Sequence, residues 1–263
     1  MLTFLPTIRN TLTWARISSL KQNFILNWPE NRKNKQLLKE ILLLECPLPQ
    51  KDRVNAIRNW VNINSTHKID HEHDQYAFQI HTVLKKLLDH HATKTSPPHL
   101  SCGPRSYALK ELLKLVGIKS RVIDIFQISD GVVNPHTLLE VYCSENDRWI
   151  LQDPDFNVEY ALKLEEKIPL SSESSLLSDK SRVQYSTNKY VIENTLNCTN
   201  TIAHCFDQCV LHRLSYDGNR SIALIKDKTV LDKMITSNDQ TLSFRQYLEQ
   251  RGHSPRIIEL AHL

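Results

Sequence analysis

The sequence predicts an α+β fold in which a helical N-terminal part packs on an antiparallel β meander. In residues 1–100, apolar side chains recur three or four positions apart, which is the spacing of one helix face. The pattern changes after Gly117, where runs at 121–128, 136–143 and 148–153 are strand-like and are separated by turn-forming residues. Helices followed by consecutive short strands indicate separate α and β layers rather than alternating βαβ units.

The predicted helices are short and their ends are marked by proline and glycine. Three of them precede residue 100, at 35–46, 51–64 and 72–91. A fourth covers 103–116, because Pro104 fits only the first turn of a helix and Gly117 is a typical residue just beyond a helix end.

The region after residue 154 has weaker signals. Asp217-Gly218 lies between two apolar runs and predicts a hairpin within 205–231. A last helix is expected at 240–252, and the serine-rich stretch 171–181 is expected to be an exposed loop.

Composition excludes several classes of protein. The 33 lysines and arginines are scattered along the 263 residues and give a net charge of only +4, so nucleic-acid binding is not expected. The chain contains no run of 18 apolar residues, and basic residues interrupt its first 24 positions, so neither a membrane span nor a secretory signal is predicted. Six cysteines are few for a disulfide framework, and we expect a cytoplasmic protein with reduced thiols.

Cys102 lies at the predicted start of the helix 103–116. Helix N-termini favour negative charge, and the thiolate is the reactive form of cysteine. The backbone N–H of Cys102 could also serve as a hydrogen-bond donor to an oxyanion. The competing interpretation is an ordinary buried thiol, because cysteine is among the residue types most often buried.

His136 and Asp153 lie on two strands joined by the short turn 144–147, so these strands should pair in an antiparallel hairpin. If Cys143 pairs near Arg148 or Asn146, His136 falls opposite a position between Asp153 and residue 155. Side chains alternate with a period of two, so His136 and Asp153 then share a face within imidazole-to-carboxylate reach. A histidine held in this way can accept the proton of a thiol while the carboxylate fixes its tautomer.

Each of these three residues also has an ordinary explanation, since the chain has twelve histidines and Asp153-Pro154 could be turn chemistry. Their joint order strengthens the catalytic interpretation. The stretch resembles the transglutaminase-like superfamily of papain-like cysteine enzymes in three motifs. They are Cys102 followed by Ala108 and "LLKLVGIKSRVI", then "HTLLEVY" at 136–142, then "WILQDP" at 149–154.

The resemblance covers about 51–157 and includes "AIRNWV" (56–61), which is similar to an upstream helix of the family. It implies a papain/transglutaminase-like core with Cys102 as nucleophile, His136 as base and Asp153 as orienting carboxylate. Leu138 and Leu100 stand where family members often have an aromatic residue and a glycine. By analogy a second oxyanion donor comes from a side chain, with candidates Trp60, His99 and Tyr107.

Three regions follow from this resemblance. Residues 1–50 are expected to form a helical extension, 51–160 the transglutaminase-like catalytic core, and 161–263 a C-terminal extension packed on the core. The roles of the two extensions are left open.

A metal site is the rival interpretation for another part of the chain. Cys205, Cys209 and His212 are spaced to share a face if that segment is helical, with Cys198 and His204 nearby. No C-x-x-C pair is present, so a buried helix face is the simpler account and no metal or cofactor is predicted.

The predicted function is cysteine-dependent acyl transfer on amide or peptide carbonyls through a thioester intermediate. Water as acceptor gives an amidase or protease and an amine gives a transamidase; hydrolysis is favoured because nothing indicates an amine site. Alternatives are acetyl transfer like that of arylamine N-acetyltransferases and a non-catalytic binding module that keeps the fold. A protein or peptide substrate is expected, without nucleic acid or membrane, and the oligomeric state is left open.

Overall fold

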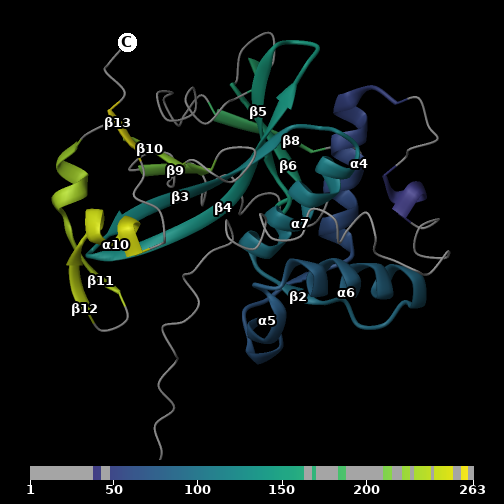
Figure 1. Ribbon diagram of the computed structural model, residues 1–263, viewed down its shortest axis with the longest axis horizontal. Coiled ribbons are helices and arrows are strands. Elements are labelled where there is room, and N and C mark those ends of the chain that lie inside the picture. Colours follow the sequence, from purple (N-terminus) through teal and green to yellow (C-terminus); the bar gives the residue numbers. More distant parts are fainter. Residues whose placement is uncertain are drawn as a thin grey trace, which may run out of the picture.

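A computed structural model gives the three-dimensional structure of the chain. It describes residues 38–42, 48–162, 168–169, 183–187, 210–214, 221–225, 228–237, 240–250 and 256–259. The helices before residue 116 gather on one side of a largely antiparallel sheet, and a long hairpin of that sheet extends away from them towards the C-terminal elements (Figure 1). This arrangement confirms the predicted α+β class.

The helical part consists of α4 (Gln50–Ile63), α5 (His71–Tyr76), α6 (Ile80–Thr93) and α7 (Cys102–Leu115). The predicted helices 51–64 and 103–116 are confirmed to within one residue at each end, and Gly117 has the positive φ of 74° expected just beyond a helix end. Of the predicted helix 35–46, only residues 38–42 are described, and 38–41 are helical.

The single helix predicted at 72–91 is two helices, with a break at residues 77–79. Asp70 caps α5 by accepting a hydrogen bond from the His73 backbone N–H at 3.1 Å. The Tyr76 hydroxyl accepts a hydrogen bond from the His99 N–H at 2.9 Å, which holds α5 beside the short parallel pair β1 (Thr66–His67) and β2 (His99–Leu100). The break therefore lets α5 support the chain before Cys102 while α6 packs into the core.

The central sheet is formed by β3 (Ser120–Ser129), β4 (Val132–Cys143), β5 (Arg148–Asp153) and β6 (Val158–Leu162), each antiparallel to the next. The strand predicted to begin at residue 136 begins four residues earlier. Asp130 and Gly131, with φ of 51° and 72°, form a tight two-residue turn, and the pairing of β3 with β4 continues up to it.

The C-terminal elements extend this sheet and add a small layer at its far end. The remaining sheet strands are β7 (Ile168–Pro169), β8 (Val183–Thr187), β9 (Val210–Leu214), β10 (Ser221–Ile225) and β13 (Arg256–Glu259). The strands β9 and β10 pair antiparallel, which confirms the predicted hairpin, although its turn at 217–218 and the predicted loop at 171–181 lie outside the described residues.

The helix predicted at 240–252 is wrong in its first four residues. They form β12 (Gln240–Ser243), which pairs with β11 (Met234–Ser237) after a 3-10 turn at Lys228–Asp232. The helix α10 covers Phe244–Gln250, and residues 251–252 of the prediction lie outside the described residues. Cross-strand pairing outweighs the weak helical preference of this segment, as is common for short elements.

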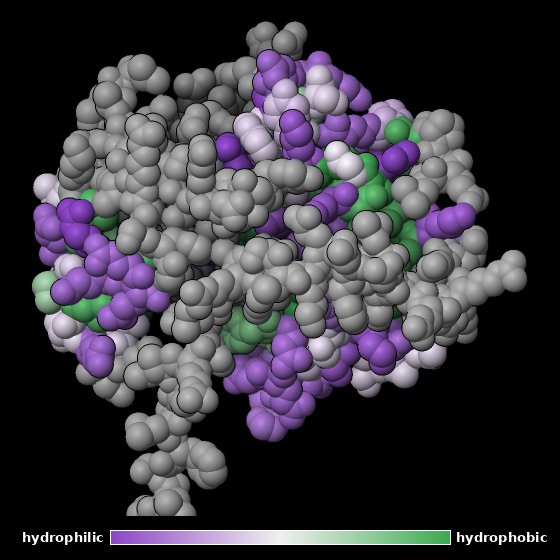
Figure 2. Space-filling view, viewed as in Figure 1, coloured by the Kyte–Doolittle hydropathy of each residue, from purple (hydrophilic) through white to green (hydrophobic). Residues whose placement is uncertain are grey.

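Two apolar clusters hold the described elements together. The larger one lies between α4, α6, α7 and one face of the sheet, with buried side chains such as Ile57, Leu87, Leu109 and Leu139. Each such residue contributes about 1.5–3 kcal/mol by leaving water. The surface over α5 is hydrophilic (Figure 2). Among the described residues no helix has both the length and the apolar character needed to cross a bilayer.

Candidate active site

Cys102 is the first residue of α7, at the predicted start of this helix. Its thiol is free and partly exposed. The preceding residue, Ser101, has an extended backbone and makes no side-chain capping bond. Its hydroxyl therefore does not cap the first N–H groups of the helix. These groups carry the positive end of the helix dipole.

His136 and Asp153 contact each other as the hairpin register predicted. In the ladder between β4 and β5, Cys143 pairs with Arg148 and Leu139 with Gln152. Continuing this register places both side chains on one face. The imidazole Nε2 lies 2.8 Å from Asp153 Oδ2, and both residues are buried.

The Asp153 carboxylate is hydrogen-bonded on both oxygens. Oδ1 accepts from the backbone N–H groups of Asp155 and Phe156, at 2.9 and 3.1 Å. Oδ2 accepts from His136 and from the Tyr160 hydroxyl, the latter at 2.9 Å. The turn at Asp153-Pro154 is thus part of the site itself, and Tyr160 is a site residue that the sequence analysis missed.

Cys102 and Asp153 both act on the pKa of His136. Burial alone would lower the pKa of His136, but the charge and hydrogen bond of Asp153, together with a side-chain hydrogen bond to Cys102, raise that pKa well above 6.5. Because Nε2 is bonded to Asp153, Nδ1 is the ring nitrogen left for the thiol. The Phe156 ring packs against the imidazole with centroids 5.4 Å apart.

The helix that carries Cys102 is docked directly on the strand that carries His136. Ser106, one turn into α7, donates its hydroxyl hydrogen to the Thr137 carbonyl oxygen at 2.9 Å. Gly103 faces the same residue, and a Cβ placed on it would lie 3.9 Å from Thr137 Oγ1. These contacts fix the position of α7 along β4 next to the imidazole.

A polar face of α4 holds the chain that follows Asp153. Asn62 donates to the carbonyl oxygens of Pro154 and Asp155 at 3.0 and 2.9 Å. Asn157 donates to Asn59 at 2.9 Å and accepts from Arg58 Nε at 3.2 Å. The sequence analysis recognised this helix only by its apolar side, although polar residues at positions 58, 59 and 62 share its other face.

Arg58 brings a buried positive charge to the same region. Its exposed fraction is 1%, and its guanidinium also donates to Gln152. Burial lowers the pKa of Arg58 to about 10, while the charges of Glu159 and Asp153 act in the opposite direction. Arg58 therefore remains charged at neutral pH near Asp153.

Of the three side-chain candidates for an oxyanion donor, two are hydrogen-bonded elsewhere and one is buried in the core. The indole N–H of Trp60 donates to His91 at 3.1 Å. Tyr107 is buried in the larger apolar cluster. The His99 ring lies 2.9 Å from Asp70. Among the described contacts, none brings these side chains to Cys102.

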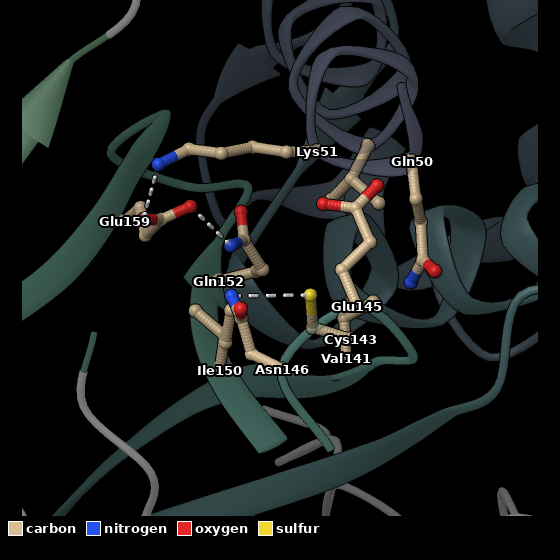
Figure 3. Close-up of a pocket in the computed structure, with 10 residues that line it drawn as sticks. Gln50, Lys51, Val141, Cys143, Glu145, Asn146, Ile150, Gln152 and Glu159 are labelled. Atoms are coloured by element: carbon tan, nitrogen blue, oxygen red, sulfur yellow. Dashed lines mark hydrogen bonds and ion pairs between the residues drawn. The ribbon is translucent and has the colours of Figure 1, made fainter. Parts of the chain in front are cut away.

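A separate cavity of about 60 Å³ lies between the start of α4 and the β4–β5 hairpin (Figure 3). Val54, Val141, Cys143 and Ile150 line its apolar side. The buried Glu159 in its wall is already paired, with Lys51 at 3.3 Å and with Gln152 at 3.0 Å. With room for a few water molecules only, the cavity is not a substrate site.

The structure offers no support for the rival metal interpretation within the residues it describes. His212 lies in the strand β9, while Cys198, His204, Cys205 and Cys209 lie outside the described residues. The described part of the chain contains no group of three His, Cys, Asp or Glu side chains arranged to hold a metal ion.

Comparison with known proteins gives two similar solved structures. A proposed cysteine protease from Cytophaga hutchinsonii matches with a TM-score of 0.34 and 15% identity, over 59% of this chain and 46% of that one. A TGase matches with a TM-score of 0.28 and 18% identity, over 50% of this chain and 35% of that one. No family model and no curated protein matches. The chain is thus distantly similar in structure to a cysteine protease and a transglutaminase, and it spans less than half of each.

Proposed function

We propose that the chain is a cysteine-dependent acyl-transfer enzyme with Cys102 as nucleophile, His136 as general base and acid, and Asp153 as orienting carboxylate. The observation that carries the proposal is the buried contact of His136 with Asp153 at 2.8 Å, together with the free Cys102 thiol, which acts to raise the pKa of His136. This order of thiol, imidazole and carboxylate is the arrangement that activates a nucleophilic cysteine.

In the acylation step, His136 takes the thiol proton and the Cys102 sulfur attacks the carbonyl carbon of an amide. A C–S bond forms and the carbonyl oxygen becomes an oxyanion. The imidazolium then gives its proton to the amide nitrogen, the C–N bond breaks, and an amine or ammonia leaves a thioester on Cys102. Asp153 stabilises the positive imidazolium during this step.

In the second step, His136 takes a proton from a water molecule that attacks the thioester carbonyl. The C–S bond breaks, releasing a carboxylic acid and restoring the thiol–imidazole pair. An amine in place of water would form a new amide instead. Hydrolysis is the proposed outcome because water needs no dedicated binding site.

The backbone N–H of Cys102 is the proposed donor to the oxyanion. It belongs to the first turn of α7, where N–H groups lack partners within the helix. Such a donor contributes about 10²–10³-fold to the rate in related chemistry. A protein or peptide is the proposed substrate, and a reducing, cytoplasmic compartment suits a mechanism that needs Cys102 as a free thiol.

The test is release of ammonia or amine from a panel of peptides and protein glutamine or asparagine side chains. We expect activity that Cys102→Ala abolishes while leaving the unfolding midpoint within a degree or two. Activity that survives in Cys102→Ala would contradict the proposal. Turnover of acetyl-CoA with an arylamine acceptor, and no amide cleavage, would instead point to acetyl transfer.

Labelling of Cys102 tests the binding-module alternative without a substrate. Iodoacetamide should modify Cys102 at pH 6 faster than it modifies a small-molecule thiol, and His136→Ala should remove that advantage. Peptide mapping assigns the label to Cys102. Equal rates for Cys102 and the free thiol would favour a module that keeps the fold without catalysis.

A further inference from the structure

A second buried ion pair lies beside the Cys102–His136 pair. Arg105 is on α7, three residues after Cys102, and Asp155 follows Asp153 by two residues. Arg105 Nη1 lies 2.9 Å from Asp155 Oδ1, and the side chains of both residues are 4% exposed. Removing one partner of an ion pair this well buried strongly destabilises the protein.

Arg105 joins three segments of the site. Besides the carboxylate, Nη1 donates to the Asp155 backbone carbonyl oxygen at 3.1 Å. Nη2 donates to the carbonyl oxygen of Ser65, beyond the end of α4, at 2.9 Å. The guanidinium reaches the two segments with separate nitrogens of one planar fork, whereas a lysine ammonium has a single nitrogen.

These contacts close a ring around the site. From α7 the ring runs through the Ser106 hydroxyl to the Thr137 carbonyl oxygen, next to His136, then through His136 to Asp153, and from Asp153 Oδ1 to the Asp155 backbone N–H. The Asp155 carboxylate closes the ring by accepting a hydrogen bond from Arg105 on α7. The nucleophile and the carboxylate are therefore held at a fixed separation from two directions.

The charges of the two pairs are complementary. Arg105 lies close enough to Cys102 for their charges to interact, and Asp155 does the same with His136. The cation of the second pair, three residues after Cys102 on the same helix, thus acts on the sulfur, and its anion acts on the imidazole. This orientation favours a thiolate beside an imidazolium.

Other charged groups surround Asp155 and His136. His67, on β1, contacts Asp155 Oδ1 at 2.7 Å and is half-exposed. From the side of β5, Asp153 faces the imidazole directly, and the charge of Arg58 acts on Asp153. Burial would raise the pKa of Asp155, but the His67 hydrogen bond and the charges of Arg105 and His136 lower it below its usual value.

We propose that Arg105 is a positioning residue that ties the Cys102 helix to the Asp153–Asp155 segment and supplies a positive charge that stabilises the Cys102 thiolate. The inference rests on the proposed function only in treating Cys102 and His136 as the reacting pair. Neither Arg105 nor Asp155 belongs to the motifs that carry the family resemblance.

The experiment measures iodoacetamide labelling of Cys102 from pH 4 to 9 by peptide mapping, using the full chain. In Arg105→Gln the ratio of the labelling rate at pH 5 to the labelling rate at pH 9 should fall about tenfold. This fall corresponds to a shift of the acidic limb of the pH–rate profile by about one pH unit. Arg105→Lys keeps the charge without the fork, so it should keep most of the wild-type ratio while losing stability. A purely structural role would lower stability in both variants without moving the ratio in either.

Arg121→Gln is the matched control. Arg121 pairs with the buried Glu140 at 2.5 Å and lies over the Trp149 ring at 3.9 Å, so its loss also removes a buried ion pair. We expect it to lower the unfolding midpoint and leave the pH 5 to pH 9 ratio unchanged. A folded Arg105→Gln protein with the wild-type ratio would overturn the proposal.

Asp155→Asn gives an independent decision if Arg105→Gln does not fold. Asparagine has the shape of aspartate, and the variant keeps the backbone N–H that donates a hydrogen bond to Asp153. It removes the negative charge near His136. The rate ratio of anionic iodoacetate to neutral iodoacetamide reports the imidazolium charge. As the pH rises, this rate ratio should fall at a lower pH in Asp155→Asn than in the wild type. An unchanged profile would refute the coupling of the Arg105–Asp155 pair to the Cys102–His136 pair.

The same measurements separate this inference from the proposed function. If wild-type Cys102 reacts no faster than a free thiol, the proposed function fails. If Cys102 is highly reactive but the Arg105 and Asp155 variants keep its profile, only the inference about Arg105 fails.

Discussion

Asp153 is the residue on which the geometry of the site depends most. Its Oδ1 is held by two backbone N–H groups, which leaves Oδ2 directed at His136 and at the Tyr160 hydroxyl. A carboxylate in this position fixes the imidazole with its proton on Nε2 and leaves Nδ1 free to accept one from Cys102.

Replacing Asp153 by asparagine should therefore invert the tautomer. The amide oxygen would keep the two backbone bonds, and the NH₂ group would face His136 and force its Nε2 to accept. The proton would then reside on Nδ1, so the ring could no longer take the thiol proton. We expect the amide-cleavage rate of Asp153→Asn to fall by about 10⁴-fold, as removal of such a carboxylate does in triads generally.

The matched control for this variant is Tyr160→Phe, which removes one of the four hydrogen bonds to Asp153 and leaves its charge. Its rate should fall by no more than about 150-fold, because one hydrogen bond to a charged carboxylate contributes about 1.5–3 kcal/mol. Steady-state rates of the two variants, compared with Cys102 labelling, provide the check. Equal losses in both variants would mean that Asp153 acts only by packing.

The pH dependence of stability should reveal His136. Its pKa is raised above 6.5 by Asp153 and Cys102 against the effect of burial, and a group of this kind binds its proton more tightly in the folded state. Its contribution to the free energy of unfolding is complete below pH 6.5 and is lost as the pH rises through the folded pKa. Urea unfolding from pH 6 to 9 should show this loss in the wild type. A His136→Gln protein with the same slope would rule out His136 as its source.

At the scale of elements, the docking of α7 on β4 should be sensitive to Ser106. Its buried hydroxyl donates to the Thr137 carbonyl oxygen. Ser106→Ala leaves that carbonyl without this donor and should lower the free energy of unfolding by about 1–3 kcal/mol. Thr93→Ala is a suitable comparison, since its exposed hydroxyl donates to the Asp89 carbonyl oxygen at 2.6 Å. Equal unfolding midpoints in urea for the two variants would contradict the docking role.

The sequence was sufficient to predict those elements that are marked by residues within or next to them. The start of α7 is marked by Pro104, and the register between β4 and β5 follows from a short turn with alternating side chains. The catalytic assignment of Cys102, His136 and Asp153 remains a prediction that the labelling and activity assays above test.

The residues that support the site could not be predicted in this way. Asn62 and Arg58 contact residues more than 90 positions away in the chain, and Arg105 contacts a residue 50 positions away. Nothing in the spacing of these side chains identifies their partners, because the pairing is set by how α4 packs on the turn after β5. A polar helix face reads as solvent-exposed until the tertiary structure covers it.

At the scale of the whole molecule, the sheet connects the strands that bear the site to the C-terminal elements. The strand β3 pairs with β4 on one side and with β9 on the other. At its far end, Phe126 of β3 packs against Phe244 and Tyr247, with ring centroids 5.7 and 5.9 Å apart. The second apolar cluster therefore joins the C-terminal elements to the hairpin that carries His136.

This connection predicts that the two regions unfold together. Phe244 has no exposed surface, and Phe244→Ala should lower the free energy of unfolding by about 3–5 kcal/mol through loss of burial and creation of a cavity. Urea unfolding followed by far-UV circular dichroism and by iodoacetamide labelling of the buried Cys143 thiol on β4 should give one transition with coincident midpoints, both shifted to lower urea. Arg245→Ala, which changes a neighbouring exposed side chain, should leave the midpoints in place. If Cys143 became exposed only in a later transition that Phe244→Ala does not move, the helical part and β4–β5 would be an independent folding unit, and the far end of the β3–β4 hairpin would contribute nothing to the stability of the site.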